Sequence, residues 1–282
     1  MQNLKRTKFH RSVAGALVAS FFVCSSPAAV AAPIADPEYQ VKLRLSEQAV
    51  DFNGEPSAQF RDSFKVLGEG SAEEAVYLDT ADGFYSKNGW SIRLRHKESA
   101  SNYDLTYKYR QPLFYNSLSK DVVEDGLREA RDKGFDSSDT NYDAQVNASY
   151  RSSSLDFSNK KTATCVTAQC EIPTVDRAAP IVTDAEPGKM QKTTGRKLES
   201  SDLKMSQTVS QKSWRVEIGG IKTDLEVARF GGTTWVEISE EETSRKDAAR
   251  KRDELIKELD RAGLLVKEDA FKTQVVLAGG WQ

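Results

Sequence analysis

From residue 38 onward, most segments of this 282-residue chain alternate polar and apolar residues with a period of two. Successive side chains of a β-strand point to opposite faces of a sheet, so this period predicts strands rather than helices. The predicted strands are 38–45, 76–79, 91–97, 103–110, 204–218, 221–230 and 233–240, with a further hairpin formed by 142–150 and 152–157. The chain is therefore expected to be mainly β.

Between the predicted strands, other patterns indicate helices, turns and one long loop. Apolar spacing predicts helices over 56–67, 122–131 and 243–262, and the last of these has Ser244 or Thr243 as a cap. Asp82-Gly83 and Asn88-Gly89 predict tight turns. Residues 173–200 are rich in Thr, Pro, Gly and charge, which predicts a long loop. Residues 270–277 are predicted to form a last strand.

Charged residues share one face of each predicted strand. Glu38, Gln40, Lys42 and Arg44 alternate with apolar residues, basic residues dominate the strands at 91–110, and acidic residues dominate those at 222–240. Taken strand by strand, an antiparallel sheet with its polar face in water explains this pattern. If the strands instead closed into a barrel with the charged faces inward, its lumen would have a cationic and an acidic wall. Such a lumen could hold a polyanion on the bases and divalent cations on the carboxylates.

The N-terminus has the layout of a cleavable signal peptide. A basic region that contains Lys5 and Arg11 precedes an apolar run at 13–23, and Ala29-Val30-Ala31 supplies the small residues that signal peptidase accepts. The apolar run is too short to cross about 30 Å of hydrocarbon, which disfavours the alternative of a membrane anchor. We therefore expect a signal peptide over residues 1–31, a periplasmic or secreted mature protein, and no membrane insertion after cleavage.

Charge and residue counts exclude several classes of function. The chain has 40 basic and 42 acidic residues, and four of the basic ones lie in the predicted signal, so the mature protein is acidic and not suited to general nucleic-acid binding. His96 is the one histidine after the signal, which disfavours His-rich zinc sites and Ser-His-Asp catalysis. Cys165 and Cys170 are predicted to form a disulfide in an oxidising compartment, with two free thiols as the alternative.

Several of these strands resemble the motifs of one family. Glu38-x-Gln40-x-Lys42 is similar to the ExExK signature of the CYTH superfamily, also called triphosphate tunnel metalloenzymes. The family's Y-x-D-T-x-D, G-x-x-L-R-x-R and L-T-x-K stretches are resembled by Tyr77-Leu78-Asp79-Thr80-Ala81-Asp82, Gly89-Trp90-Ser91-Ile92-Arg93-Leu94-Arg95 and Leu105-Thr106-Tyr107-Lys108. The segments around Glu226 and Glu237 resemble its acidic closing strands. The resemblance covers 38–110 well and 204–265 more loosely, and 111–200 is expected to be an insertion.

The resemblance implies both a fold and a ligand. The fold would be mainly β (α+β), with one domain over 32–282 that forms a closed eight-stranded antiparallel tunnel barrel, flanking helices and a C-terminal helix. The ligand would be a triphosphate or polyphosphate, bound with Mg²⁺ or Mn²⁺. By motif position, Glu38 and Lys42 would be the catalytic residues. Metal would be held by Glu38, Gln40, Glu226 and Glu237, and phosphate by Lys42, Arg44, Arg93, Arg95, Lys108 and Arg110.

Two departures from the family pattern leave the activity open. Gln40 and Ser239 stand where acids are expected, and an amide or a hydroxyl is a poorer ligand for a hard dication than a carboxylate. One hypothesis is a metal-dependent hydrolase of triphosphate or polyphosphate. The other is a non-catalytic binding protein of the same fold for phosphorylated or other anionic small molecules. A third alternative, an unrelated barrel with an apolar lumen, predicts that Arg93, Arg95 and Lys108 are exposed to solvent.

Overall fold

The computed structural model describes residues 32–114, 117–167 and 169–281. The predicted signal peptide lies outside these residues. Within them, no helix is both long and apolar enough to span a membrane.

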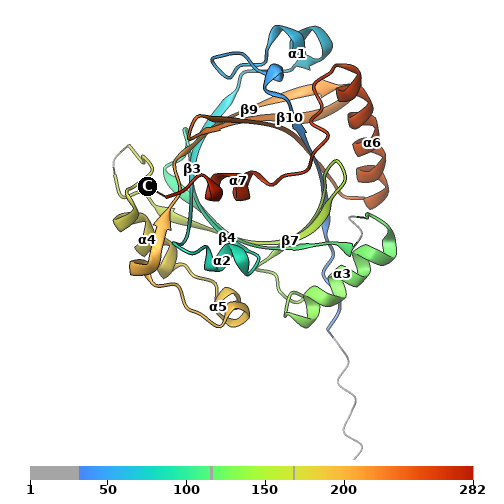
Figure 1. The fold of residues 1–282 in the computed structure, drawn as a ribbon. Coiled ribbons are helices and arrows are strands. Elements are labelled where there is room, and N and C mark those ends of the chain that lie inside the picture. The colour runs from blue at the N-terminus through green and yellow to red at the C-terminus, as the bar shows by residue number, and fades with distance from the viewer. Residues whose placement is uncertain (1–31, 115–116, 168, 282) are drawn as a thin grey trace, which may run out of the picture. The chain divides into compact units, whose positions relative to one another are not determined.

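The strands form one sheet that closes on itself. Its order is β2-β9-β10-β11-β1-β6-β7-β5-β4-β3-β8, and β3 also pairs with β9, which closes a ring of nine strands within the described part of the chain (Figure 1). The strands are β1 (Glu38–Leu45), β2 (Lys65–Val66), β3 (Ser71–Thr80), β4 (Trp90–Lys97), β5 (Asn102–Pro112), β6 (Asp143–Ala148), β7 (Ser153–Thr164), β8 (Leu203–Met205), β9 (Val209–Ile218), β10 (Ile221–Phe230) and β11 (Thr233–Glu242).

The prediction of eight antiparallel strands is wrong in number and in one pairing. A closed ring with an odd number of strands cannot alternate in direction all the way round, so at least one neighbouring pair must be parallel. That pair is β1 and β6, where Glu38 lies opposite Gln145 and Val41 opposite Ala148. The other pairs in the ring are antiparallel. The predicted hairpin at 142–157 is confirmed as β6 and β7, so the segment 111–200 supplies two strands of the ring.

Helices cover the outside of the ring, and one lies inside its outline (Figure 1). The helices are α1 (Ala58–Ser63), α2 (Phe84–Lys87), α3 (Lys120–Asp132), α4 (Val175–Asp184), α5 (Gly188–Thr194), α6 (Arg245–Arg261) and α7 (Lys272–Ala278). The predicted helices at 122–131 and 243–262 are confirmed as α3 and α6, and the Ser244 hydroxyl caps α6 by accepting from the backbone N–H of Asp247. Only the middle of 56–67 is helical, since β2 follows α1.

The segment 173–200, predicted to be a long loop, instead forms α4 and α5. The composition of this segment is dominated by Thr, Pro and charged residues, but its few apolar residues lie on one side. Ala178, Val182 and Met190 are buried against the outer face of the ring. The hydroxyl of Tyr107 in β5 donates a 2.5 Å hydrogen bond to the Val182 carbonyl and fixes α4 to the sheet.

The strand predicted at 270–277 is also wrong, because these residues form most of α7. Val275 and Val276 favour a strand locally, but the closed ring leaves no long free edge with which this segment could pair. Val276 instead packs inside the ring against Tyr77, Ala228 and Trp235.

The apolar faces of the strands point outward, under the helices. Leu43, Leu225 and Ile238 share one buried cluster with Leu255 and Leu259 of α6. A second outer cluster joins β4, β5 and β7 to α3, α4 and α5. Because the helices take these apolar faces out of water, the alternate, charged faces of the same strands point into the ring.

Candidate functional site

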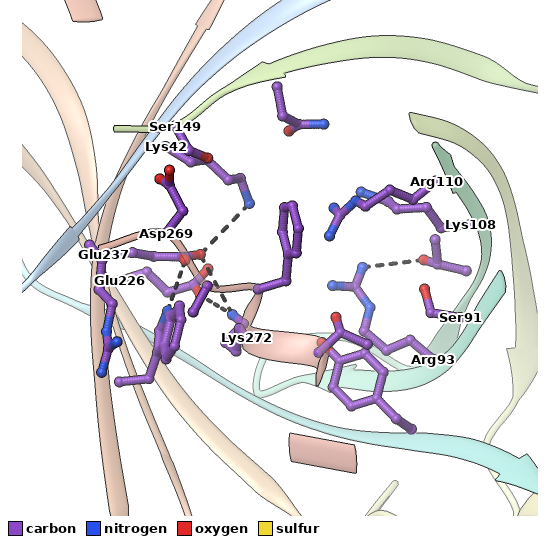
Figure 2. Close-up of a pocket in the computed structure, with 18 of the residues that line it drawn as sticks. Lys42, Ser91, Arg93, Lys108, Arg110, Ser149, Glu226, Glu237, Asp269 and Lys272 are labelled. Carbon is purple, nitrogen blue, oxygen red and sulfur yellow. Dashed lines mark hydrogen bonds and ion pairs between the residues drawn. The ribbon is translucent and has the colours of Figure 1, made fainter. Parts of the chain in front are cut away.

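A cavity of about 120 Å³ lies inside the ring, lined by residues from strands and from the C-terminal segment. Among the described residues, six cationic and four acidic side chains line it: Lys42, Arg44, Arg93, Lys108, Arg110 and Lys272, with Glu226, Glu237, Glu268 and Asp269. Figure 2 shows Arg93, Lys108 and Arg110 on one side, which we call the basic wall. Glu226 and Glu237, which we call the acidic pair, lie on the opposite side.

Strand register places these groups. Residues two apart in a strand share a face, so Lys42 and Arg44 of β1 point inward together, as do Lys108 and Arg110 of β5. Glu226 of β10 lies directly opposite Glu237 of β11, which brings the two carboxylates of the acidic pair together. In the next strand, Arg44 lies opposite Glu237.

A buried carboxylate behind the basic wall fixes two of its cations. Asp156 of β7 is fully buried and accepts from Arg110 Nε at 2.7 Å and Nη2 at 2.6 Å, and Lys108 Nζ lies 3.1 Å from its Oδ2. Burial by itself would raise the pKa of Asp156, but the neighbouring Lys108 and Arg110 outweigh it and hold that pKa below its usual range. Burial, with Arg110 and Lys42 nearby, lowers the pKa of Lys108 to about 8 despite Asp156.

Two other polar groups in the cavity have unused hydrogen-bonding capacity. Arg93 donates from Nη2 to Thr106 Oγ1 at 3.2 Å, but its buried Nε has no partner among the described residues, and no ion pair joins its guanidinium there. Asn147 of β6 is 3% exposed, and neither atom of its amide is hydrogen-bonded within that part of the chain. Buried polar groups in proteins are nearly always paired, so both groups indicate a place for a ligand or for water.

The acidic pair is already bound to ammonium groups. Lys272 of α7 forms an ion pair with the Glu226 carboxylate, lies 3.9 Å from Glu237 Oε1, and donates to Gln211 Oε1 at 2.7 Å. Lys42 Nζ lies 3.7 Å from Glu237 Oε1. Burial raises the pKa of Glu226 more than Lys272 lowers it. For Glu237 the effect of burial is outweighed by Lys42 and Lys272, which lower its pKa to about 2.

The cavity brings together most, but not all, of the site residues predicted from sequence. Lys42, Arg44, Arg93, Lys108, Arg110, Glu226 and Glu237 line it. Glu38 is exposed, and neither it nor Gln40 is among the lining residues. Arg95 also lies outside the lining and is ion-paired with Glu73 at 3.2 Å and Asp104 at 2.8 Å.

The predicted set of metal ligands does not converge as the resemblance implies. The described residues contain no group of three or more His, Cys, Asp or Glu side chains placed to hold a metal ion. Mg²⁺ and similar hard cations take about six oxygen ligands. Glu268 and Asp269 also line the cavity, but they form no ligand group with the acidic pair. The oxygens of the acidic pair already contact Lys42 and Lys272. In this arrangement the donor set does not fit Mg²⁺ or Mn²⁺.

Sequence reasoning missed Asp156, Asn147, Phe271 and Lys272. Asp156 belongs to a short alternating run in which Ser154 and Ser158 share its face, and that pattern could have marked it as inward-facing. Phe271 lies against the guanidinium of Arg110, with the ring centroid 4.3 Å from Cζ. Nothing in the local sequence indicates that 268–273 enters the ring, because that depends on distant strands.

Two further predictions concern residues away from the cavity. Cys165 and Cys170 are bonded as a disulfide in the loop after β7, as predicted. Asp79 of the Y-x-D-T-x-D resemblance is 1% exposed and accepts hydrogen bonds from the backbone N–H groups of Thr80, Tyr85 and Ser86. This motif aspartate therefore holds the turn from β3 into α2.

Comparison with known proteins finds similar solved structures only. No family model and no curated protein matches the sequence. A candidate adenylate cyclase from Bacillus halodurans is 14% identical, with 87% of this chain and 98% of that chain covered and a TM-score of 0.46. A candidate adenylyl cyclase from Hippeastrum, described as having a dominant triphosphatase activity, is 14% identical, with 86% and 96% covered and a TM-score of 0.45. A candidate adenylate cyclase from Vibrio parahaemolyticus is 12% identical, with 86% and 99% covered and a TM-score of 0.41. Likenesses at this level do not establish a shared function.

The Asp156 carboxylate is expected to be essential for stability. In Asp156→Asn, Lys108 and Arg110 lose their buried counter-charge, and we expect the free energy of unfolding to fall by about 3–5 kcal/mol. Chemical denaturation would measure this change. Asp143→Asn removes the solvent-exposed pair with Lys160 and serves as a control, for which we expect a change of at most about 1 kcal/mol. Equal effects of the two substitutions would contradict the role assigned to Asp156.

Proposed function

We propose that this chain is an anion-binding tunnel protein that holds a phosphate-chain ligand against the basic wall. The observation that carries the proposal is Arg93, an inward-facing guanidinium with no ion pair in the described part of the chain and a buried Nε without a partner. Guanidinium groups bind phosphate oxygens through paired, charge-assisted hydrogen bonds, so a phosphate would supply the acceptors that Arg93 lacks.

The surrounding cations support the same class of ligand. Lys108 and Arg110 stand beside Arg93 on β4 and β5, and Asp156 neutralises only one of their two charges. The resemblance of this region to phosphate-gripping motifs points the same way. A cavity of about 120 Å³ suits a small anion or the end of a longer phosphate chain, and not a folded nucleic acid.

Metal-dependent hydrolysis is the second candidate. It is favoured by the acidic pair, which faces the basic wall across the cavity (Figure 2). Hydrolysis of a phosphoanhydride by this route needs carboxylates free to hold a cation that neutralises charge and positions water. Because Lys42 and Lys272 already contact those carboxylates, the geometry supports binding better than hydrolysis.

Calorimetry with tripolyphosphate tests the proposal on the chain that begins at Ala32. We expect the unsubstituted protein to bind, and Arg93→Gln to weaken binding about 10- to 100-fold, because a hydrogen bond to a charged group contributes about 1.5–3 kcal/mol. Lys160→Gln removes an exposed cation from β7 and should leave the affinity unchanged. Absence of binding would refute the proposal, and release of phosphate with Mg²⁺ or Mn²⁺ would favour the second candidate.

The affinity is also expected to depend on pH through Lys108. This ammonium is charged below its pKa of about 8 and neutral above it, so affinity for an anion should be higher at pH 7 and fall as the pH rises through 8. We expect a loss of roughly tenfold, equivalent to about 1.4 kcal/mol. Lys108→Arg keeps its charge over this range, so its titration separates the lysine from protonation of the ligand. An equal pH dependence in both proteins would exclude Lys108 as the cause.

The proposed site of action is outside the cytoplasm, periplasmic or secreted. Its support is the basic region, apolar run and Ala29-Val30-Ala31 sequence at the N-terminus, together with a disulfide suited to an oxidising compartment. Expression of the full chain in a bacterium should yield an extracytoplasmic protein whose intact mass, measured by mass spectrometry, equals that of the chain starting at Ala32. Recovery of the uncleaved chain from the cytoplasm would contradict this.

A further inference from the structure

The C-terminal segment places a cation on the acidic pair. Lys272, at the start of α7, contacts Glu226 and lies 3.9 Å from Glu237 Oε1, and its side chain is 14% exposed. Gln211 Oε1 of β9 accepts a hydrogen bond from Lys272 Nζ at 2.7 Å. Figure 2 shows Lys272 beside the two carboxylates, on the side of the cavity opposite the basic wall.

The position of Lys272 is fixed by packing along the rest of the segment. Phe271 lies against Arg110, and Val276 is buried against Tyr77 and Trp235 inside the ring. Beyond α7, Trp281 forms a β-bridge with Ser206 and donates from Nε1 to the Ala81 carbonyl at 3.3 Å. Because the segment is held at both ends, Lys272 is a built component of the cavity and not a loose surface side chain.

Lys42 completes a group in which charge is balanced. Two ammonium groups, Lys42 and Lys272, contact the two carboxylates Glu226 and Glu237. A divalent cation on the same carboxylates would have to displace Lys272 from Glu226 and would lie within a few ångströms of two positive charges. In a cavity shielded from water such repulsion is strong, so the lysine and a dication compete for one position.

We propose that Lys272 takes the place of a divalent cation on Glu226 and Glu237, so that the cavity binds its phosphate-chain ligand without a metal. The proposal rests on the proposed function for the ligand. Its central claim, that the ammonium of Lys272 excludes a metal from the acidic pair, can be measured without any ligand. It also accounts for the poor fit of the donor set to Mg²⁺ or Mn²⁺.

The first experiment measures Mn²⁺ binding by electron paramagnetic resonance with no phosphate present. We expect the unsubstituted chain to bind no stoichiometric Mn²⁺. We expect Lys272→Met to bind one ion per chain, with an affinity at least tenfold above the detection limit set by the unsubstituted chain. Adding Glu237→Gln to Lys272→Met should abolish that site, whereas Lys272→Arg should bind no Mn²⁺. Lys267→Met removes an exposed lysine from the same segment and should behave like the unsubstituted chain.

The second experiment measures tripolyphosphate affinity by calorimetry in EDTA and in Mn²⁺. Because Mn²⁺ also binds tripolyphosphate in solution, Lys272→Met with Glu237→Gln serves as the reference for the change of affinity between the two buffers. We expect the unsubstituted chain to match this reference, and Lys272→Met to gain at least tenfold more affinity in Mn²⁺. A folded Lys272→Met protein that gains no Mn²⁺ would overturn the proposal. If Lys272→Met does not fold, the unsubstituted chain decides. Stoichiometric Mn²⁺ bound to the unsubstituted chain and lost in Glu237→Gln would overturn the proposal. No bound Mn²⁺ on the unsubstituted chain would support it. Failure of the proposed function has a separate signature, namely no tripolyphosphate binding in either buffer.

Discussion

The orientation of the strands in the ring determines most of what this structure can do. Each strand has an apolar face that must leave water, and α3 to α6 cover those faces on the outside. The charged faces are then directed into a narrow lumen, where an unpaired charge is costly. Ion pairs inside the ring offset that cost, as between Asp156 and Arg110 or between Arg95 and Glu73. An interior of this kind is stable only if nearly every charge has a partner, so an unpaired cation is informative.

Whether a cation inside the ring has an acidic partner separates basic residues that the sequence motifs do not distinguish. Arg93 and Arg95 are two apart on β4 and belong to one motif, and the buried Nε of each lacks a partner in the described part of the chain. Arg95 is nevertheless ion-paired with Glu73 and Asp104, whereas the one partner that the described residues give Arg93 is the Thr106 hydroxyl. Similarly, Lys42 contacts Glu237, whereas Lys108 and Arg110 share a single carboxylate. On this side of the cavity, the described residues therefore give the three cations Arg93, Lys108 and Arg110 one carboxylate among them, that of Asp156, which contacts the last two.

The sequence predicted features that depend on neighbouring residues and failed where distant pairing decides. Alternation identified β1, β4 and β5 and the face that carries Lys42, Arg93 and Lys108, because the side-chain period is a local property. The closure of these strands into one ring of nine and the parallel β1–β6 pair depend on which edges meet, which the period does not encode. The same holds for Lys272, whose partner Glu226 is 46 residues away in the chain. Residues 270–277 include the β-branched Thr273, Val275 and Val276, which locally favour a strand. The closed ring overrides this preference because it leaves no long edge for the segment to pair with.

The two departures from the acidic signature, Gln40 and Ser239, and the position of Lys272 all make the acidic side of the ring less negative. Gln40 and Ser239 are neutral where acids are expected, and Ser239 lies directly opposite Lys42 in the sheet. Each missing carboxylate makes the charged faces of β1 and β11 less negative, and the ammonium of Lys272 adds a positive charge to the acidic pair that remains. A metal-dependent site would obtain comparable positive charge from a bound dication. In our proposal the chain supplies this charge with Lys272, a residue that is part of the fold, so that the lumen needs no metal to balance the acidic pair.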